Sequence, residues 1–399
     1  MTTLAGVGIS HHRHTTRASQ EAVQQALTAA QITGTPDFVF LFASLGYDQT
    51  QLLQAVRAAT GHCPLAGCSG QGIIVQQEAD ESGFSVAVLA IQSDELTLQN
   101  HFVTDLQQNS YQAGTTLGSK ITCDIRTHNC EDAVALLLFP DGFTFNFDRF
   151  KSGLETELDL QHPLPILGGA AGSDTEMRHT YQYYNDQVLQ NGAVAVLLSG
   201  QAQIVWGLHH GCSPIGTERK VTKAIANRIY ELDGKPIFQV LQEYLTLEEI
   251  KTWDRTIGTF CFGLRSPLLP EGELTIRYLP GRNEAEGYVT LQSEVPEGTS
   301  IWVMRRAAEK LSEGIDQVAT EIQNQIGRDR QPKLIFQFDC YGRGSTILTQ
   351  QQKLDLVEQL QSNFDRQLPW IGFYTHGELA PINSENALHN YTVVLTAIY

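Results

Sequence analysis

Two short segments near the end of the chain carry side chains that could bind or react with a small molecule. They are Asp339-Cys340-Tyr341-Gly342-Arg343-Gly344 and His376-Gly377-Glu378. An arginine beside a cysteine favours the thiolate, and a guanidinium can hold a carboxylate through two parallel hydrogen bonds. Each segment follows an apolar run, and in open α/β sheets ligands gather outside the carboxyl ends of strands. We therefore predict that one ligand-binding site is formed by Cys340, Gly342, Arg343, His376, Gly377 and Glu378.

The same residues have a purely structural interpretation. Cys340 could be a small buried apolar residue and Arg343 a surface charge. Alternatively, Arg343 and Glu378 could form an ion pair that only shapes the loop. His376 could be a hydrogen-bonded structural histidine rather than a ligand of a metal or haem.

A third candidate is the glycine loop Gly67-Cys68-Ser69-Gly70-Gln71-Gly72. It is similar to a nucleophile elbow, but Gln71 stands where Gly-x-Ser-x-Gly requires glycine. A serine in such a loop is more often a turn residue, so we predict no catalytic residue here. Gly67, Cys68 and Ser69 remain candidates for ligand binding. An enzyme would have to use Cys340 or Cys68 as its nucleophile, and the sequence offers no identifiable base for either thiol.

Two histidine runs could in principle hold a metal. In His11-His12-Arg13-His14, only His12 and His14 share a face of a strand, and no acidic or cysteine partner lies near them. The pair His209-His210 has the same weakness. We predict no metal site.

The elements that would position these residues form an internal repeat. Each copy consists of a strand, a helix, a second strand that ends in a glycine loop, and a third strand. The first strands begin near Phe38, Ala133 and Leu334, and the glycine loops begin at Gly67, Gly168 and Gly372. The predicted fold is α/β, with mixed sheets covered by helices, because the strands are apolar on both faces. Whether the copies share one sheet or face each other stays open.

The stretch between the second and third copies has a different pattern. Short strands alternate with turn signals there, and a helix is expected over Arg305–Ile326. We predict a boundary near residue 212, which divides the chain into an N-terminal module, 1–212, and a C-terminal module, 213–399.

Composition excludes several classes of protein. Lys and Arg number 27 against 44 Asp and Glu, so the formal charge is −17 and nucleic acid is an improbable partner. The longest apolar runs are far shorter than the roughly 20 residues of a membrane span, and the start of the chain lacks the features of a secretory signal. The cysteines form no Cys-x-x-Cys pair, which favours reduced thiols in the cytoplasm. They are Cys63, Cys68, Cys123, Cys130, Cys212, Cys261 and Cys340.

Several motifs resemble the FIST family of paired N- and C-terminal sensory modules. In the first half of the chain they are Asp37–Ser44, Pro64–Gly72 and Leu167–Gly169. In the second half they are Ile229–Pro236, Val295–Thr299, Cys340–Arg343 and Gly372–Glu378. The resemblance extends from about residue 30 to the end of the chain.

The resemblance implies a cytoplasmic sensor that binds a small molecule, with an amino acid or another carboxylate as the expected ligand. It also implies signalling through a separate partner protein, because the two modules fill the chain. Three alternatives stay open. The protein could be a haem-dependent nitric oxide sensor, since some bacterial members bind haem; a scaffold for protein interactions; or a cysteine-dependent enzyme. No cofactor is required by the sequence.

Overall fold

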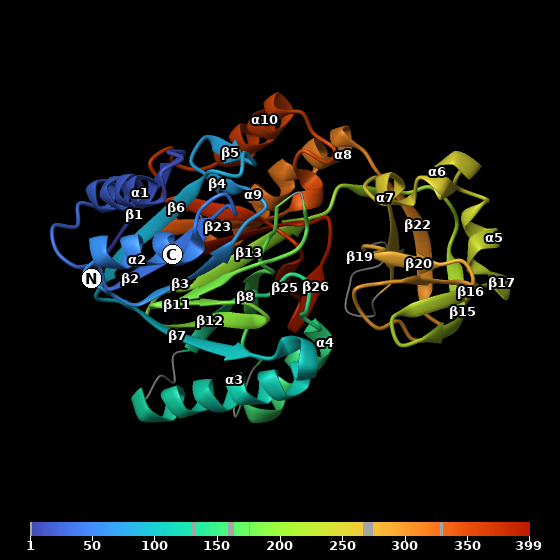
Figure 1. The fold of residues 1–399 in the computed structure, drawn as a ribbon, viewed down its shortest axis with the longest axis horizontal. Helices are drawn as coiled ribbons and strands as arrows, with labels where there is room; N and C mark the ends of the chain where they lie inside the picture. Colours follow the sequence, from blue (N-terminus) through green and yellow to red (C-terminus); the bar gives the residue numbers. More distant parts are fainter. Residues whose placement is uncertain (1, 129–132, 159–162, 175, 266–273, 328–329) are drawn as a thin grey trace.

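The computed structural model describes residues 2–128, 133–158, 163–174, 176–265, 274–327 and 330–399. The fold is α/β, with mixed sheets flanked by helices, which confirms the predicted class (Figure 1). The molecule has two parts. The lobe is the described part of residues 213–306, and the body is the remainder.

The body consists of three copies of one unit, and each copy is longer than the sequence pattern indicates. An edge strand and a helix come before the predicted series in every copy. The first copy contains β1 (Thr3–Ser10), α1 (Thr15–Ala30), β2 (Phe38–Ala43), α2 (Gln49–Ala59), β3 (Leu65–Ser69), β4 (Ile73–Val75), β5 (Glu78–Asp80) and β6 (Val86–Ser93). The second contains β7 (Leu96–Thr104), α3 (Leu106–His128), β8 (Ala133–Pro140), α4 (Phe147–Glu157), β9 (Ile166–Gly169), β10 (Gln182–Tyr184), β11 (Gln187–Leu189) and β12 (Gly192–Gly200). The third contains β13 (Ile204–His209), α8 (Ala308–Glu313), α9 (Ile315–Ile326), β23 (Leu334–Cys340), the 3₁₀ turn η1 (Tyr341–Arg343), α10 (Gln350–Gln361), β24 (Trp370–Thr375), β25 (Glu378–Ile382), β26 (Glu385–His389) and β27 (Val393–Ile398).

Each copy forms one six-stranded sheet, but it takes its last two strands from another copy. The strand orders are β1-β6-β2-β3-β10-β11, β7-β12-β8-β9-β25-β26 and β13-β27-β23-β24-β4-β5. In each sheet the first and second strands of the predicted series are parallel, and the remaining neighbours are antiparallel. The second copy therefore lends its hairpin to the first, the third lends to the second, and the first lends to the third.

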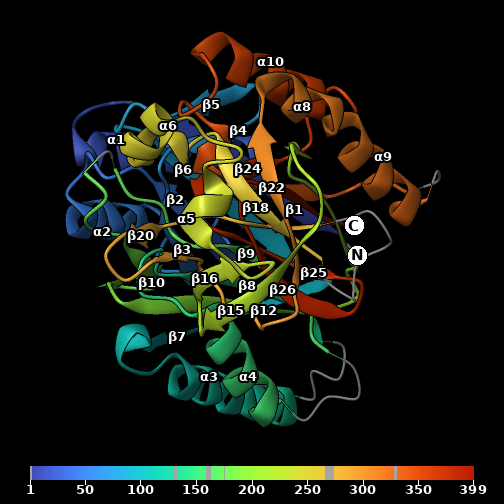
Figure 2. The same ribbon diagram turned by 90° about the vertical axis from the view of Figure 1, so that its right-hand side faces the viewer.

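The three sheets face one another around a shared core, which answers the question that the sequence leaves open. Alternate residues of β2, β8 and β23 point inward, and their aromatic rings meet across the sheets. The ring centroids of Phe40 and Phe336 are 5.0 Å apart, and those of Phe42 and Phe139 are 5.4 Å apart. The outer faces are covered by helices: α1 and α2, α3 and α4, and α9 and α10 lie on three sides of the body (Figure 2).

The lobe is inserted into the third copy between its edge strand and its helices, and it has its own core (Figure 1). Figure 2 shows it in front of the three-sheet body. Its elements are β14 (Cys212–Pro214), β15 (Arg219–Ile225), β16 (Arg228–Leu232), β17 (Lys235–Pro236), α5 (Ile237–Leu241), α6 (Leu247–Lys251), α7 (Trp253–Thr256), β18 (Phe260–Leu264), β19 (Thr275–Arg277), β20 (Gly281–Asn283), β21 (Tyr288–Thr290) and β22 (Ser300–Arg306).

One predicted element is wrong in part. The helix expected over Arg305–Ile326 begins only at Ala308, because β22 continues to Arg306 and pairs with both β14 and β18. The helical stretch is also divided at Gly314, where α8 ends and α9 starts. The division of the chain at residue 212 stays a prediction about modules along the sequence. In space, strands from both sides of that residue share sheets.

Candidate functional site

Each edge strand of the body runs beside the hairpin of a neighbouring sheet, and we call these three junctions seams. At the first seam His11 beside β1 contacts Glu78 of β5. At the second, the Asn100 side-chain amide on β7 donates to Asn185 Oδ1 over 3.0 Å. At the third, Trp206 Nε1 on β13 donates to the carbonyl oxygen of Pro381 on β25 over 3.1 Å.

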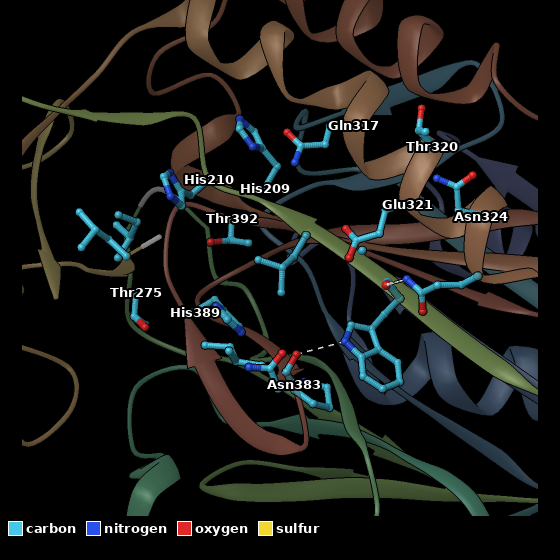
Figure 3. A pocket seen from close by; sticks show the side chains of 18 of the residues that line it. His209, His210, Thr275, Gln317, Thr320, Glu321, Asn324, Asn383, His389 and Thr392 are labelled. Carbon is cyan, nitrogen blue, oxygen red and sulfur yellow. Dashed lines mark hydrogen bonds between the residues drawn. The ribbon is translucent and has the colours of Figure 1, made fainter. Parts of the chain in front are cut away.

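The third seam opens into a cavity of about 1020 Å³, which we call the seam cavity. Its wall is built from four parts of the chain: β13 and the residues after it, β19 of the lobe, α9, and the β25–β26 hairpin with Thr392 (Figure 3). A volume of this size fits a small-molecule site, and such sites are often found where two parts of a protein meet. The lining residues are Trp206–His210, Leu274–Ile276, Asp316, Gln317, Thr320, Glu321, Asn324, Gln325, Pro381–Asn383, His389 and Thr392.

The polar wall of the cavity follows from the helical period of α9. Its apolar residues Ile315, Val318 and Ile322 recur on the face that packs on the outer side of β13 and β27. The stripe beside that face carries Gln317, Thr320, Glu321 and Asn324 into the cavity, as Figure 3 shows.

Two histidines of the cavity are uncharged at neutral pH. Burial, together with the positive charge of Arg343, lowers the pKa of His209 to about 4. Burial likewise lowers the pKa of His389 to about 4, although Nε2 of His389 lies 3.0 Å from the Ala380 carbonyl oxygen. The side chain of Glu321 adds an acidic group. The cavity therefore offers neutral imidazoles, amides, hydroxyls and carboxylates rather than a concentration of positive charge.

Directly behind the cavity wall lies the carboxyl group of Glu378, which is fully buried. The backbone N–H of Thr392, a lining residue, donates to its Oε2 over 3.2 Å. The Thr375 hydroxyl and the Cys340 thiol also hydrogen-bond this carboxyl group. Burial raises the pKa of Glu378 to about 8, so the group is mostly protonated at neutral pH. Two of the predicted site residues, Cys340 and Glu378, are thus brought together.

Arg343 has a different partner. Its Nε donates to Asp339 Oδ1 over 2.7 Å, and Gln337 donates to the other oxygen of Asp339 over 3.1 Å. Since Asp339 and Cys340 are consecutive on β23, their side chains leave opposite faces of the sheet. Burial raises the pKa of Asp339, and the charge of Arg343 counteracts that rise. Arg343 therefore lies in the helix-covered layer, while Cys340 and Glu378 lie on the other side of the strand.

His376 and Gly377 lie at a junction where loops of all three copies meet. The backbone N–H of His376 donates to Ala170 O over 3.0 Å, and Gly377 O accepts from the N–H of Ala170 over 2.8 Å. The His376 ring packs near Tyr341 and Phe143, with centroids 5.0 and 5.2 Å away, and burial lowers its pKa to about 4.

The remaining predicted residues take structural positions. Gly67 is paired within the first sheet, where a Cβ atom would lie 1.8 Å from the carbonyl oxygen of Leu41. Cys68 belongs to the shared core, and Ser69 donates to the carbonyl oxygen of Gly172 over 2.7 Å. A Cβ atom on Gly342 would lie 2.6 Å from the Tyr391 ring. That these residues bind a ligand stays a prediction.

Cys68 and Cys340, the two cysteines considered as nucleophiles, are poorly suited to catalysis. Burial raises the pKa of Cys68 and of Cys340 well above the ordinary value, which keeps both as poorly nucleophilic thiols. Cys123 is exposed, whereas Cys130 lies outside the described residues.

The seam cavity is also a poor match for haem. Histidine can be an axial ligand of haem iron, and His209 and His210 line the cavity, but burial of the apolar porphyrin ring requires apolar surface. The α9 side of the cavity presents amides, a hydroxyl and a carboxylate instead. In the part of the chain that the structure describes, no three His, Cys, Asp or Glu side chains are grouped to hold a metal ion. No described helix is both long and apolar enough to cross a membrane.

Sequence reasoning missed the residues that line the cavity. It noted His209 and His210 only as a weak metal motif, and it did not single out Trp206, Glu321 or His389. The signal available in the sequence was the polar stripe of α9, which lies beside the apolar face of that helix.

Comparison with known proteins agrees with the resemblance seen in the motifs. The FIST N domain matches residues 37–235, and the FIST C domain matches residues 238–381. An uncharacterized protein of Mycobacterium tuberculosis (strain ATCC 25618 / H37Rv) is 28% identical over 97% of both chains. An uncharacterized protein of Mycobacterium bovis is 26% identical over 97% of this chain and 96% of its own.

Two solved structures align with the whole chain at low similarity. A chorismatase has a TM-score of 0.39 and 10% identity, covering 100% of this chain and 98% of its own. A cyanuric acid hydrolase from A. caulinodans has a TM-score of 0.40 and 8% identity, and the alignment covers 100% of this chain and 99% of the hydrolase chain. The tandem domain match is the decisive finding: FIST domains are small-ligand sensory domains in signal transduction, and this chain belongs to the FIST family.

Proposed function

We propose that this protein is a cytoplasmic sensor that binds its small ligand in the seam cavity and signals through a separate partner protein. The observation that carries the proposal is the cavity itself, because its wall combines residues of the body with residues of the lobe. A ligand in such a position contacts both parts at once.

The chemistry of the wall favours a ligand with both charged ends of an amino acid. An ammonium group can pair with the Glu321 carboxylate, whereas a carboxylate can accept hydrogen bonds from Thr275, Thr392 or His210. An amino acid can use both kinds of partner, whereas a simple carboxylate can use only the hydrogen-bond donors. The neutral state of His209 and His389 disfavours a ligand that carries only negative charge.

The contacts between lobe and body next to the cavity provide a route for the signal. Arg277 Nη1 in the lobe donates to the carbonyl oxygen of Leu388 over 2.8 Å, and the backbone N–H of Tyr278 donates to Asn390 Oδ1 over 3.0 Å. His389, a lining residue, stands between these two acceptors. A ligand held by Thr275 beside His389 therefore lies next to the contacts between lobe and body.

The test is calorimetric titration of the full chain with a panel of amino acids and small carboxylates. We expect at least one amino acid to bind, and Glu321→Gln to weaken its binding roughly tenfold through loss of a charge-assisted hydrogen bond. Glu309→Gln, on the exposed side of α8, is the matched control and should bind as the wild type does. The proposal fails if no compound of the panel binds, or if Glu321→Gln and Glu309→Gln have the same affinity.

A further inference from the structure

A second pocket lies on the lobe and shares no lining residue with the seam cavity. Its volume is about 590 Å³. It is formed where α6 and α7 meet the turn that leads into β20. The residues that line it are Lys251, Thr252, Trp253, Arg255, Pro280, Gly281 and Arg282.

Three cationic side chains meet at this pocket, and no carboxylate is among the described residues that line it. Arg282 also has an acidic neighbour outside the pocket, since its Nη1 lies 2.9 Å from Glu284 Oε1 on an exposed side chain. For Lys251 and Arg255 the described residues supply no ion pair. Two of the three cations are thus without a neutralising partner in the described part of the chain.

The distribution of charge along the chain makes this concentration unusual. Residues 213–306 contain 12 basic and 13 acidic residues, which gives a formal charge of −1. The rest of the chain contains 15 basic and 31 acidic residues, which gives a formal charge of −16. The lobe is therefore the part of an acidic protein to which an anion is least repelled.

The indole of Trp253 supplies the second, independent observation. Trp253 is 5% exposed, and its Nε1–H has no hydrogen-bond acceptor among the described residues. The Arg282 guanidinium lies over the indole ring, 5.0 Å from its centroid. A buried donor is normally satisfied, so an unpartnered N–H in the wall of a pocket indicates that an acceptor belongs there.

We propose that this lobe pocket binds an oxyanion: a phosphate or carboxylate group of a small molecule. Such a group is an acceptor with several lone pairs, so it can take a hydrogen bond from Trp253 while it pairs with Lys251 and Arg255. The proposal is independent of the seam cavity and of its ligand.

The experiment follows the indole N–H signals of the full chain by ¹H–¹⁵N spectroscopy, and Trp253→Phe assigns one of the four tryptophan signals. The protein is titrated with inorganic phosphate, with succinate, and with sodium chloride at matched ionic strength. We expect the Trp253 signal to shift saturably with phosphate or succinate but not with chloride. A response to phosphate alone identifies a phosphoryl site, and a response to both anions identifies a general oxyanion site.

Charge variants provide a second readout that does not need the assignment. Lys251→Gln and Arg255→Gln should each weaken anion binding roughly tenfold in calorimetry. Lys223→Gln removes an exposed charge elsewhere on the lobe, on β15, and should leave the affinity unchanged. The proposal is overturned if neither anion binds, or if Lys223→Gln weakens binding as much as the two pocket variants do.

Discussion

The buried carboxyl group of Glu378 gives the sharpest prediction, because its environment fixes the direction in which pH changes stability. Its pKa is raised from an ordinary value of 4.5 to about 8. The native state therefore binds this proton more tightly than the unfolded state does. The stabilisation is fully present below pH 4.5 and is lost as pH rises toward 8.

The magnitude follows from the size of the shift. At about 1.4 kcal/mol for each pKa unit, ionisation of the unfolded state favours unfolding by about 4 kcal/mol at pH 7.5 and by less than about 1 kcal/mol at pH 5. Glu378→Gln copies the neutral acid, since the amide can accept from the Thr392 N–H and donate to the Thr375 hydroxyl. We expect the variant to gain about 3 kcal/mol over the wild type between pH 5 and pH 7.5.

The assay is thermal unfolding of both proteins across this pH range, with Glu358→Gln on the exposed side of α10 as the matched control. The difference in Tm between Glu378→Gln and the wild type should grow steadily with pH, and the control should show no trend. A difference in Tm that is constant with pH, or that shrinks as pH rises, would refute the assignment of a neutral buried acid.

Three further predictions concern the Arg343–Asp339 ion pair, the cysteines and the seam cavity. Arg343→Met leaves the Asp339 carboxylate buried without its cation, so we expect a loss of about 3–5 kcal/mol in unfolding free energy. Adding Asp339→Leu in the same chain should recover most of this loss. Equal Tm values for Arg343→Met and the wild type would contradict the prediction. Iodoacetamide should modify Cys123 in the native protein and spare Cys68 and Cys340 until denaturant is added, which peptide mass mapping detects. Modification of Cys340 at the rate of Cys123 would speak against its burial. Because the seam cavity has a polar wall, titration with haemin should produce no saturable Soret band, and the appearance of one would show that the wall accommodates a porphyrin.

The repeated strands could be predicted from the sequence because they are long and apolar. Every residue of Phe38–Ala43 is buried, so this strand is an unbroken apolar run. Such a run can be recognised in the sequence without knowledge of its partners. The hairpin exchange could not be predicted in this way. Strands such as Ile73–Val75 and Gln182–Tyr184 span three residues each, too few for a period to emerge, and their partners lie in another copy.

The candidate site likewise contains residues that could be predicted from the sequence and residues that could not. Cys340 ends β23 opposite Thr375, the last residue of the parallel strand β24, and Glu378 begins β25 three residues later, so the strand pairing brings the two side chains close. The seam cavity instead joins Trp206, Thr275 and Glu321, which come from a strand, the lobe and a helix. None of these residues belongs to a motif, and only the packing of the complete chain makes them neighbours.

The exchange of hairpins has a consequence for how the chain is made. The second sheet is completed only by β25 and β26, which are synthesised long after its edge strand β7. The third sheet in turn needs β4, which leaves the ribosome long before its partner β24. The ring of sheets therefore cannot close until β25 and β26 have been synthesised. Strands that are early in the sequence have to wait with unpaired edges, which makes folding slow and exposes the nascent chain to mispairing with other copies of itself.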